Sequence, residues 1–122
     1  MEPVVRALSE RLRVIRLFDT YGRLLTRRQQ RLLRLYYHDD LSLGEIAEQH
    51  GVSRQAVHDA LQRSAEELEH LEASLGVVEF RRQLSERVAG LAAAVRRLTD
   101  RLGAEEAAEI RQELDVLRRS IR

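Results

Sequence analysis

The sequence predicts an all-α fold: a small helix-turn-helix bundle with one long helix, followed by a C-terminal antiparallel helical hairpin. Apolar residues recur in steps of three and four along most of the chain, the spacing of a helix with one buried face. The composition agrees, because aromatic residues make up only 4% and there is a single Pro. At Thr26 and at Ser42 a hydroxyl residue stands three residues before a Gln or Glu and just ahead of an apolar run, which signals a helix start.

At 122 residues the chain has room for one small domain, or a domain with an appendage, so a large catalytic cleft is not expected. Without Cys there are no disulfides or thiolate sites, as is typical of a cytoplasmic protein. No apolar run approaches the roughly 18 residues that a membrane span requires.

Charge is distributed unevenly, although the net value is only +1. Residues 1–38 carry +6, residues 39–80 carry −8 and residues 81–122 carry +3. All 21 basic side chains are Arg, whose rigid fork binds phosphate and carboxylate groups. This usage suits a nucleic-acid partner, and the Arg codons of a GC-rich genome are the simpler explanation.

A first helix is expected to begin near Pro3, because Pro favours the first position of a helix. Its apolar stripe, expected to face the core, consists of Val4 or Val5, Leu8, Leu12 and Ile15, and Phe18 and Tyr21 continue it.

A second helix is expected over residues 27–37. Thr26 and Gln29 form a capping box at its start, in which each side chain satisfies a backbone amide of the other. Leu32, Leu33 and Tyr36 face inward, and residues 38–40 end the helix in a polar turn.

Residues 43–62 (LGEIAEQHGVSRQAVHDALQ) match a helix-turn-helix. Ser42 and Glu45 form a second capping box, and Ile46 and Ala47 give the helix after it an apolar face. Gly51 stands where the chain must turn through positive φ, and Val52 is expected to fill the corner. Ser53 then caps the recognition helix, whose Val57 and Leu61 point back onto the helix before it.

The recognition helix is expected to continue to Gly76, a plausible C-cap, because Leu68, Leu71 and Leu75 extend its apolar stripe. A helix of about 20 residues is roughly 30 Å long, which is longer than a three-helix domain can cover. Its distal half therefore needs a partner.

Two further helices are expected on either side of Gly103, the first beginning near Glu79. Their apolar seams follow heptad steps and consist of Leu84, Val88, Leu91, Val95, Leu98 and Leu102, then Ala107, Ile110, Leu114, Leu117 and Ile121. We expect an antiparallel hairpin that packs against the long helix, a second copy of the chain, or both. The predicted domains are residues 1–75 (helix-turn-helix) and 76–122 (hairpin, packing and homodimer formation).

The candidate base-reading residues lie on the outer face of the recognition helix: Ser53, Arg54, Gln55, His58, Asp59 and Gln62. There an Arg would grip guanine and a Gln would grip adenine through two-point contacts. The alternative is an ordinary solvated helix face, and because the surrounding segment is acidic, which opposes phosphate binding, both interpretations stay open.

The candidate phosphate contacts cluster at and after the start of the second helix: Thr26, Arg27, Arg28, Arg31 and Arg34. One alternative is pairing within the chain with the long helix's acids, Glu66, Glu67, Glu69 and Glu72. Another is the docking of a protein of opposite charge.

No enzyme, metal site or cofactor is expected. The four His residues, His38, His50, His58 and His70, do not share the three- or four-residue spacing of metal ligands on one helix face. The pairs Asp39-Asp40 and Glu105-Glu106 diverge as neighbours in turns and helices do, and suit a turn and a helix N-terminus.

The chain resembles the YlxM family over about residues 14–75. The resemblance rests on four stretches: residues 17–26 (LFDTYGRLLT), 35–37 (LYY), 40–47 (DLSLGEIA) and 51–57 (GVSRQAV). The later part of this region is also similar to region 4 of bacterial sigma factors, a DNA-binding helix-turn-helix, so the resemblance implies a sigma-region-4-like bundle. Arg27 and Arg28 depart from the acidic or Lys residues usual in the family.

Membership of that family implies a non-enzymatic regulatory or adaptor protein of the bacterial signal recognition particle pathway, with the particle's GTPase or its RNA as partner. The helix-turn-helix would then touch nucleic acid or the GTPase. The alternative function is a sequence-specific DNA-binding transcriptional regulator, and a third reading is a purely structural dimer module built on residues 79–121.

Overall fold

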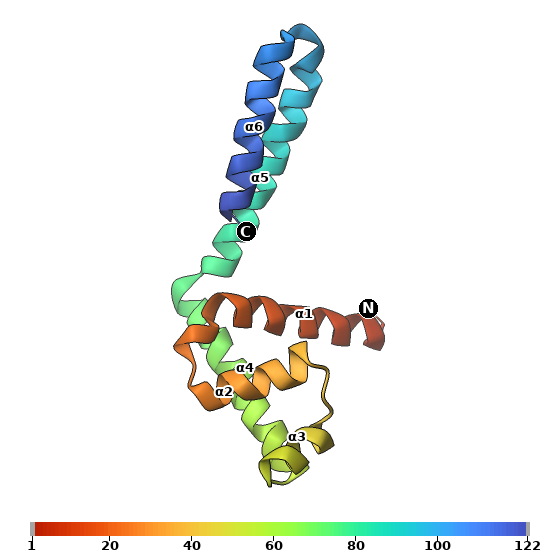
Figure 1. Cartoon of the computed structure of the whole chain (residues 1–122), viewed down its shortest axis with the longest axis vertical. Coiled ribbons are helices and arrows are strands. Elements are labelled where there is room, and N and C mark those ends of the chain that lie inside the picture. The colour runs from red at the N-terminus through yellow and green to blue at the C-terminus, as the bar shows by residue number, and fades with distance from the viewer. Residues whose placement is uncertain (1, 122) are drawn as a thin grey trace. The chain divides into compact units, whose positions relative to one another are not determined.

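The computed structural model describes residues 2–121, and the predicted all-α fold is confirmed: these residues form helices and turns without a strand. The chain divides into two compact units at the Gly76–Val77 boundary. The first unit contains helices α1 to α4, and the second contains α5 and α6 (Figure 1).

The first helix, α1 (Pro3–Tyr21), is buried only at its C-terminal end, where Leu17, Phe18 and Tyr21 enter the core against α4. The predicted inward stripe is wrong for the other end of the helix. Val4, Val5, Leu8 and Leu12 are 75%, 47%, 60% and 48% exposed, because no element covers this part of α1.

The second helix, α2 (Arg27–Leu33), begins at the predicted capping box: the Gln29 amide donates to Thr26 Oγ1 and the Thr26 amide donates to Gln29 Oε1. A wide π-type turn, Arg34–His38, continues it and closes with the Asp39 amide donating to the Arg34 carbonyl. Asp40 follows in the left-handed conformation, φ 55°. Leu32 and Leu33 are buried as predicted, and Tyr36 is half-buried.

The guanidinium of Arg11 on α1 closes this wide turn. Its Nη2 donates to the Tyr36 and Tyr37 carbonyls at 3.1 and 3.2 Å and to Asp40 Oδ1 at 2.9 Å. The guanidinium carbon also lies 5.4 and 5.0 Å from the two Tyr ring centres, within reach of a cation–π interaction. Burial raises the pKa of Tyr37.

The helix-turn-helix consists of α3 (Leu43–His50) and the start of α4 (Arg54–Leu75). The Ser42–Glu45 capping box, the left-handed Gly51 (φ 64°) and the Ser53 cap are all confirmed. Ile46 and Val57 are buried between the two helices. The role predicted for Val52 is wrong, since its side chain is 36% exposed and the corner is closed by its backbone amide, which donates to the Ala47 carbonyl.

The long helix α4 forms the spine of the first unit, since both α1 and α2 pack on it. Its buried side chains are Val57, Leu61, Ser64 and Leu68. The Ser64 hydroxyl is satisfied by donating to the Ala60 carbonyl. Gly76 ends the helix with φ 64°, as predicted, whereas Leu75 is 56% exposed.

The second unit is a hairpin of α5 (Val77–Leu98) and α6 (Ala104–Ile121), joined by a 3-10 turn at Thr99–Arg101 (Figure 1). The buried side chains are Val88, Ala92, Ala107 and Ile121. Three residues of the predicted seam, Leu91, Leu98 and Leu117, are not buried within the single hairpin and are 52%, 50% and 40% exposed. Small Ala side chains lie in the contact, and the larger residues flank it.

Candidate nucleic-acid interface

The six candidate base-reading residues all lie on the exposed part of α4 or at its cap. Ser53 is occupied locally, because its Oγ accepts from the Ala56 amide at 3.0 Å. The capped N-terminus and the left-handed Gly51 fix the angle at which α4 leaves α3. The first two turns of α4 are therefore held rigidly by α3 and keep their outer side chains accessible to a ligand.

These six residues do not form one cluster. The Arg54 side chain passes over α3, where its Nε lies 3.7 Å from the position that a Cβ on Gly44 would take. On another side of α4, Gln55 Nε2 donates to Asp59 Oδ1 at 2.9 Å, and His58 Nδ1 lies 3.5 Å from the same oxygen. The bond to Asp59 occupies one of the two N–H donors that the Gln55 amide could offer to a base edge.

The predicted phosphate-contact residues at the start of α2 are exposed: Thr26, Arg27, Arg28, Arg31 and Arg34. Among the described side chains, none of these four Arg has an acidic group within 4.0 Å, so the alternative of pairing with the acids of α4 is wrong. Two of those acids serve α1 instead: Arg13 pairs with Glu69, and the Tyr21 hydroxyl donates to Glu72 Oε1 at 2.5 Å.

A pocket of about 440 Å³ between α2 and α4 joins the two predicted sets; we call it the α2–α4 pocket. Its lining consists of Thr26, Arg28, Gln29 and Leu32 from the α2 side and Ala56, Asp59, Ala60 and Arg63 from α4. Arg63 was missed by the reasoning from sequence. The available signal was its spacing, because Gln55, Asp59 and Arg63 follow one another at four-residue steps on one helix face.

Arg34 lies apart from this pocket. It lines a separate pocket of about 280 Å³ with Phe18, Asp19, Gly22, Arg23, Gln30 and His38. In that pocket His38 Nε2 lies 3.6 Å from Asp19 Oδ1. The predicted phosphate contacts therefore occupy at least two different surfaces.

The basic charge of the first 38 residues is only partly available to a ligand. Arg11 is engaged with Asp40 and the Tyr36 and Tyr37 carbonyls, and Arg13 is engaged with Glu69. The hydrogen bond from Arg13 lowers the pKa of Glu69. Two of the nine Arg in this segment thus hold the fold together.

Two further kinds of feature bear on function, a metal-ligand cluster and a membrane-spanning helix. Among the described side chains, which leave out that of Asp100, no three His, Asp or Glu gather as metal ligands would. None of the helices in that range is both long and apolar enough to cross a membrane.

Comparison with known proteins places this arrangement in a family. The family model described as "UPF0122: Putative helix-turn-helix protein, YlxM / p13 like" matches residues 8–102. A UPF0122 protein of Geobacillus kaustophilus is 44% identical over 114 residues, covering 90% of this chain and 98% of that relative. One from Symbiobacterium thermophilum is 55% identical over 73 residues, covering 59% and 68% of the two chains.

A third relative, from Desulforamulus reducens, is 60% identical over 60 residues, which is 49% of this chain and 51% of the relative. That match spans about half the length of the relative. The description of the family is that of a helix-turn-helix protein and not of an enzyme. On the strength of the matched residues 8–102, the chain belongs to the UPF0122 family of YlxM- and p13-like helix-turn-helix proteins.

Proposed function

We propose that this chain is a non-enzymatic regulatory protein that binds nucleic acid through its helix-turn-helix and acts in the cytoplasm, in the signal recognition particle pathway. The observation that carries the binding proposal is the exposed start of α4, rigidly set by Gly51 and Ser53. In DNA-binding helix-turn-helix proteins this element enters the major groove of DNA. The unpaired Arg side chains at the start of α2 supply the positive charge that phosphate binding needs.

The assignment to the signal recognition particle rests on the resemblance to YlxM proteins alone. The particle offers two partners, its RNA and its GTPase, and the helix-turn-helix surface suits the RNA because exposed Arg lies beside α4. We also propose that the helix-turn-helix unit has the geometry of region 4 of bacterial sigma factors.

A binding experiment with the reconstituted particle tests the proposal. Purified chain is mixed with the particle, with the particle's GTPase freed of RNA, and with its receptor, and GTP turnover is measured in each case. We expect binding to the intact particle that is lost on nuclease treatment. Binding that survives nuclease treatment would assign the GTPase as partner, and no binding together with unchanged GTP turnover would refute the assignment.

A sequence-specific DNA-binding regulator is the second candidate, favoured by the position of Arg54 and Gln55 on the first turn of α4. Selection from a pool of random duplexes would then yield a base preference, and Arg54→Ala would abolish it. A pool that emerges without enrichment would refute this candidate.

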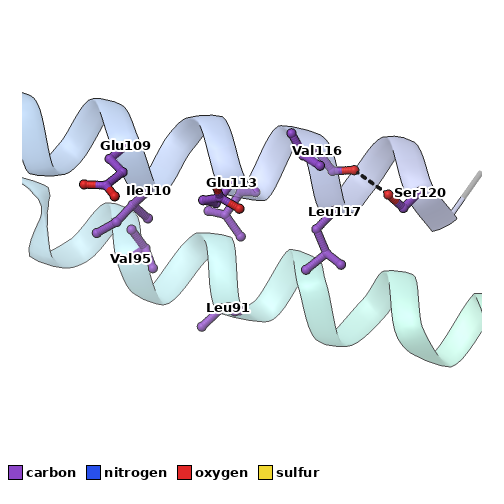
Figure 2. A pocket seen from close by; sticks show the side chains of 9 residues that line it. Leu91, Val95, Glu109, Ile110, Glu113, Val116, Leu117 and Ser120 are labelled. Atoms are coloured by element: carbon purple, nitrogen blue, oxygen red, sulfur yellow. Dashed lines mark hydrogen bonds between the residues drawn. The ribbon is translucent and has the colours of Figure 1, made fainter.

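We further propose that the hairpin pairs with the hairpin of a second copy. Within unit two, an apolar groove of about 510 Å³ is lined mainly by Leu91, Val95, Ile110, Leu114, Val116 and Leu117. Figure 2 shows Val95 and Ile110 directed toward one another from the two helices. Two helices with one narrow stripe bury little apolar surface alone, and two such grooves facing each other would form a four-helix bundle.

A further inference from the structure

The α2–α4 pocket contains an excess of hydrogen-bond donors. Arg28 and Arg63 bring two guanidinium groups from different helices, and neither has an acidic partner within 4.0 Å among the side chains that the structure describes. The pocket's carboxylate, on Asp59, already accepts from Gln55 Nε2 at 2.9 Å. The ionic lining therefore amounts to two cations and one anion.

The capping box adds two more donors to the same pocket. Thr26 Oγ1 and Gln29 Oε1 are both used as acceptors, since they take the Gln29 and Thr26 backbone amides at 3.2 and 3.0 Å. The Thr26 hydroxyl proton and the Gln29 side-chain NH₂ have no acceptor within hydrogen-bond distance in the described chain. A ligand in this pocket meets four donor groups: the two guanidinium groups have no acceptor, and the Thr26 and Gln29 oxygens each already accept one hydrogen bond.

We propose that the α2–α4 pocket binds one phosphodiester group of a nucleic-acid backbone, held between Arg28 and Arg63. This inference rests on the proposed nucleic-acid binding and names a contact residue, Arg63, for it. A phosphodiester has only acceptor oxygens and one negative charge. It therefore fits four donors and an ionic balance of +1 better than a dianionic phosphate monoester does.

The position of the pocket agrees with that ligand. Asp59 and Arg63 lie one and two turns beyond Gln55, on the same face of α4. A strand whose bases meet the first turn of α4 would then have its backbone beside the later turns and the start of α2. Asp59 thereby changes role: it is a nearby negative charge that weakens phosphate binding, and not a reader of base edges.

Salt dependence of duplex binding tests the pocket. Each phosphate neutralised contributes about 0.9 to the slope of log affinity against log salt. Arg63→Gln and Arg28→Gln should each lower that slope by about 1 and weaken binding about fivefold at 0.15 M salt, with base preference unchanged. Because both Arg hold the same phosphate, the double variant should lower the slope by about 1 and not 2. Asp59→Asn should strengthen binding.

Two controls show whether a change in slope comes from the pocket itself. Arg97→Gln removes an exposed Arg of α5 in the other unit and should leave the slope at its wild-type value, and thermal melts show that each variant is folded. The measurement is made with duplex DNA and duplex RNA in parallel. Wild-type binding whose slope is unchanged in Arg63→Gln would refute the pocket alone, whereas no binding of wild type to either duplex would refute the proposed function and the pocket together.

Discussion

Arg13 and Glu69 form a two-point ion pair that joins α1 to the middle of α4. Arg13 Nε donates to Glu69 Oε1 at 2.6 Å and Nη2 donates to Oε2 at 2.8 Å, an arrangement that matches the fork of the guanidinium to the carboxylate. Both side chains are about half exposed, at 52% and 48%. This contact joins residues 56 positions apart in the sequence.

The pair should stabilise the fold at neutral pH and cease to do so in acid. The hydrogen bond from Arg13 lowers the pKa of Glu69 in the folded state. Its contribution is therefore fully present above the unfolded pKa of Glu, about 4.3, and is lost as pH falls toward the lowered folded value. Glu69→Gln should lower the free energy of unfolding by about 0.2–1 kcal/mol at pH 7, as for other exposed pairs, and by progressively less in melts taken from pH 5 to pH 3. Glu48→Gln, at an exposed position on α3, is the control; a difference between wild type and Glu69→Gln that stays constant with pH would contradict the assignment.

Gly51→Ala and Gly90→Ala should change stability in opposite directions. No atom lies within 4 Å of a Cβ built on either residue, so backbone conformation decides the outcome. Gly51 has φ 64°, where Ala costs about 1–2 kcal/mol. Gly90 lies inside helix α5, where Ala is favoured by about 0.5–1 kcal/mol. Chemical denaturation followed by circular dichroism measures both changes, and a neutral Gly51→Ala would mean that the corner tolerates a different backbone path.

The exposed end of α1 should tolerate truncation of its apolar side chains. Leu8 is 60% exposed and Leu17 is 1% exposed on the same helix. Leu8→Ala should change the free energy of unfolding by less than about 0.5 kcal/mol, whereas Leu17→Ala should cost about 2–5 kcal/mol. A large cost for Leu8→Ala, measured at a concentration where the chain is monomeric, would mean that this stripe is covered after all.

Pairing of two hairpins should depend on Leu91 and not on Leu98. The two residues lie seven positions apart on α5 and are 52% and 50% exposed, but Leu91 lines the hairpin groove and Leu98 does not. Leu91→Glu should convert a dimer to a monomer, because a charge would be buried at the centre of the contact. Light scattering gives the solution mass, with Leu98→Glu as the matched control. A wild-type monomer, or a dimer that survives Leu91→Glu, would overturn the proposed pairing.

Local signals in the sequence predicted the elements well because their causes are local. The two capping boxes need only residues three positions apart, and Gly51 and Gly76 adopt positive φ at the helix ends they were expected to form. The period of the apolar residues likewise identified every long helix. The period shows which face of a helix is apolar, but it does not show which other element packs against that face. It therefore placed Leu8 and Leu12 in a core that does not extend to them.

In the hairpin and the candidate site, too, the spacing of residues in the sequence does not determine how the helices pack against each other. A seam of Leu and one of Ala differ by a small rotation of each helix, and Ala92 permits the closer approach that leaves Leu91 on the flank. The grouping of Arg28 with Arg63, and the separation of both from Arg34, depends on how α2 crosses α4. The spacing of residues within one helix does not determine the angle at which two helices cross.

The wide turn at Arg34–His38 constrains the number of residues that this segment can contain. Removing one residue from it would replace the wide i→i+5 turn by a regular α turn, which needs one residue fewer, and the chain beyond it would keep nearly the same orientation around the helix axis. The backbone carbonyls of the widened turn, including the two that accept from Arg11, would then be rearranged. Insertions and deletions should therefore be rarer here than in the neighbouring loop, and a relative that has lost one residue should also have replaced Arg11.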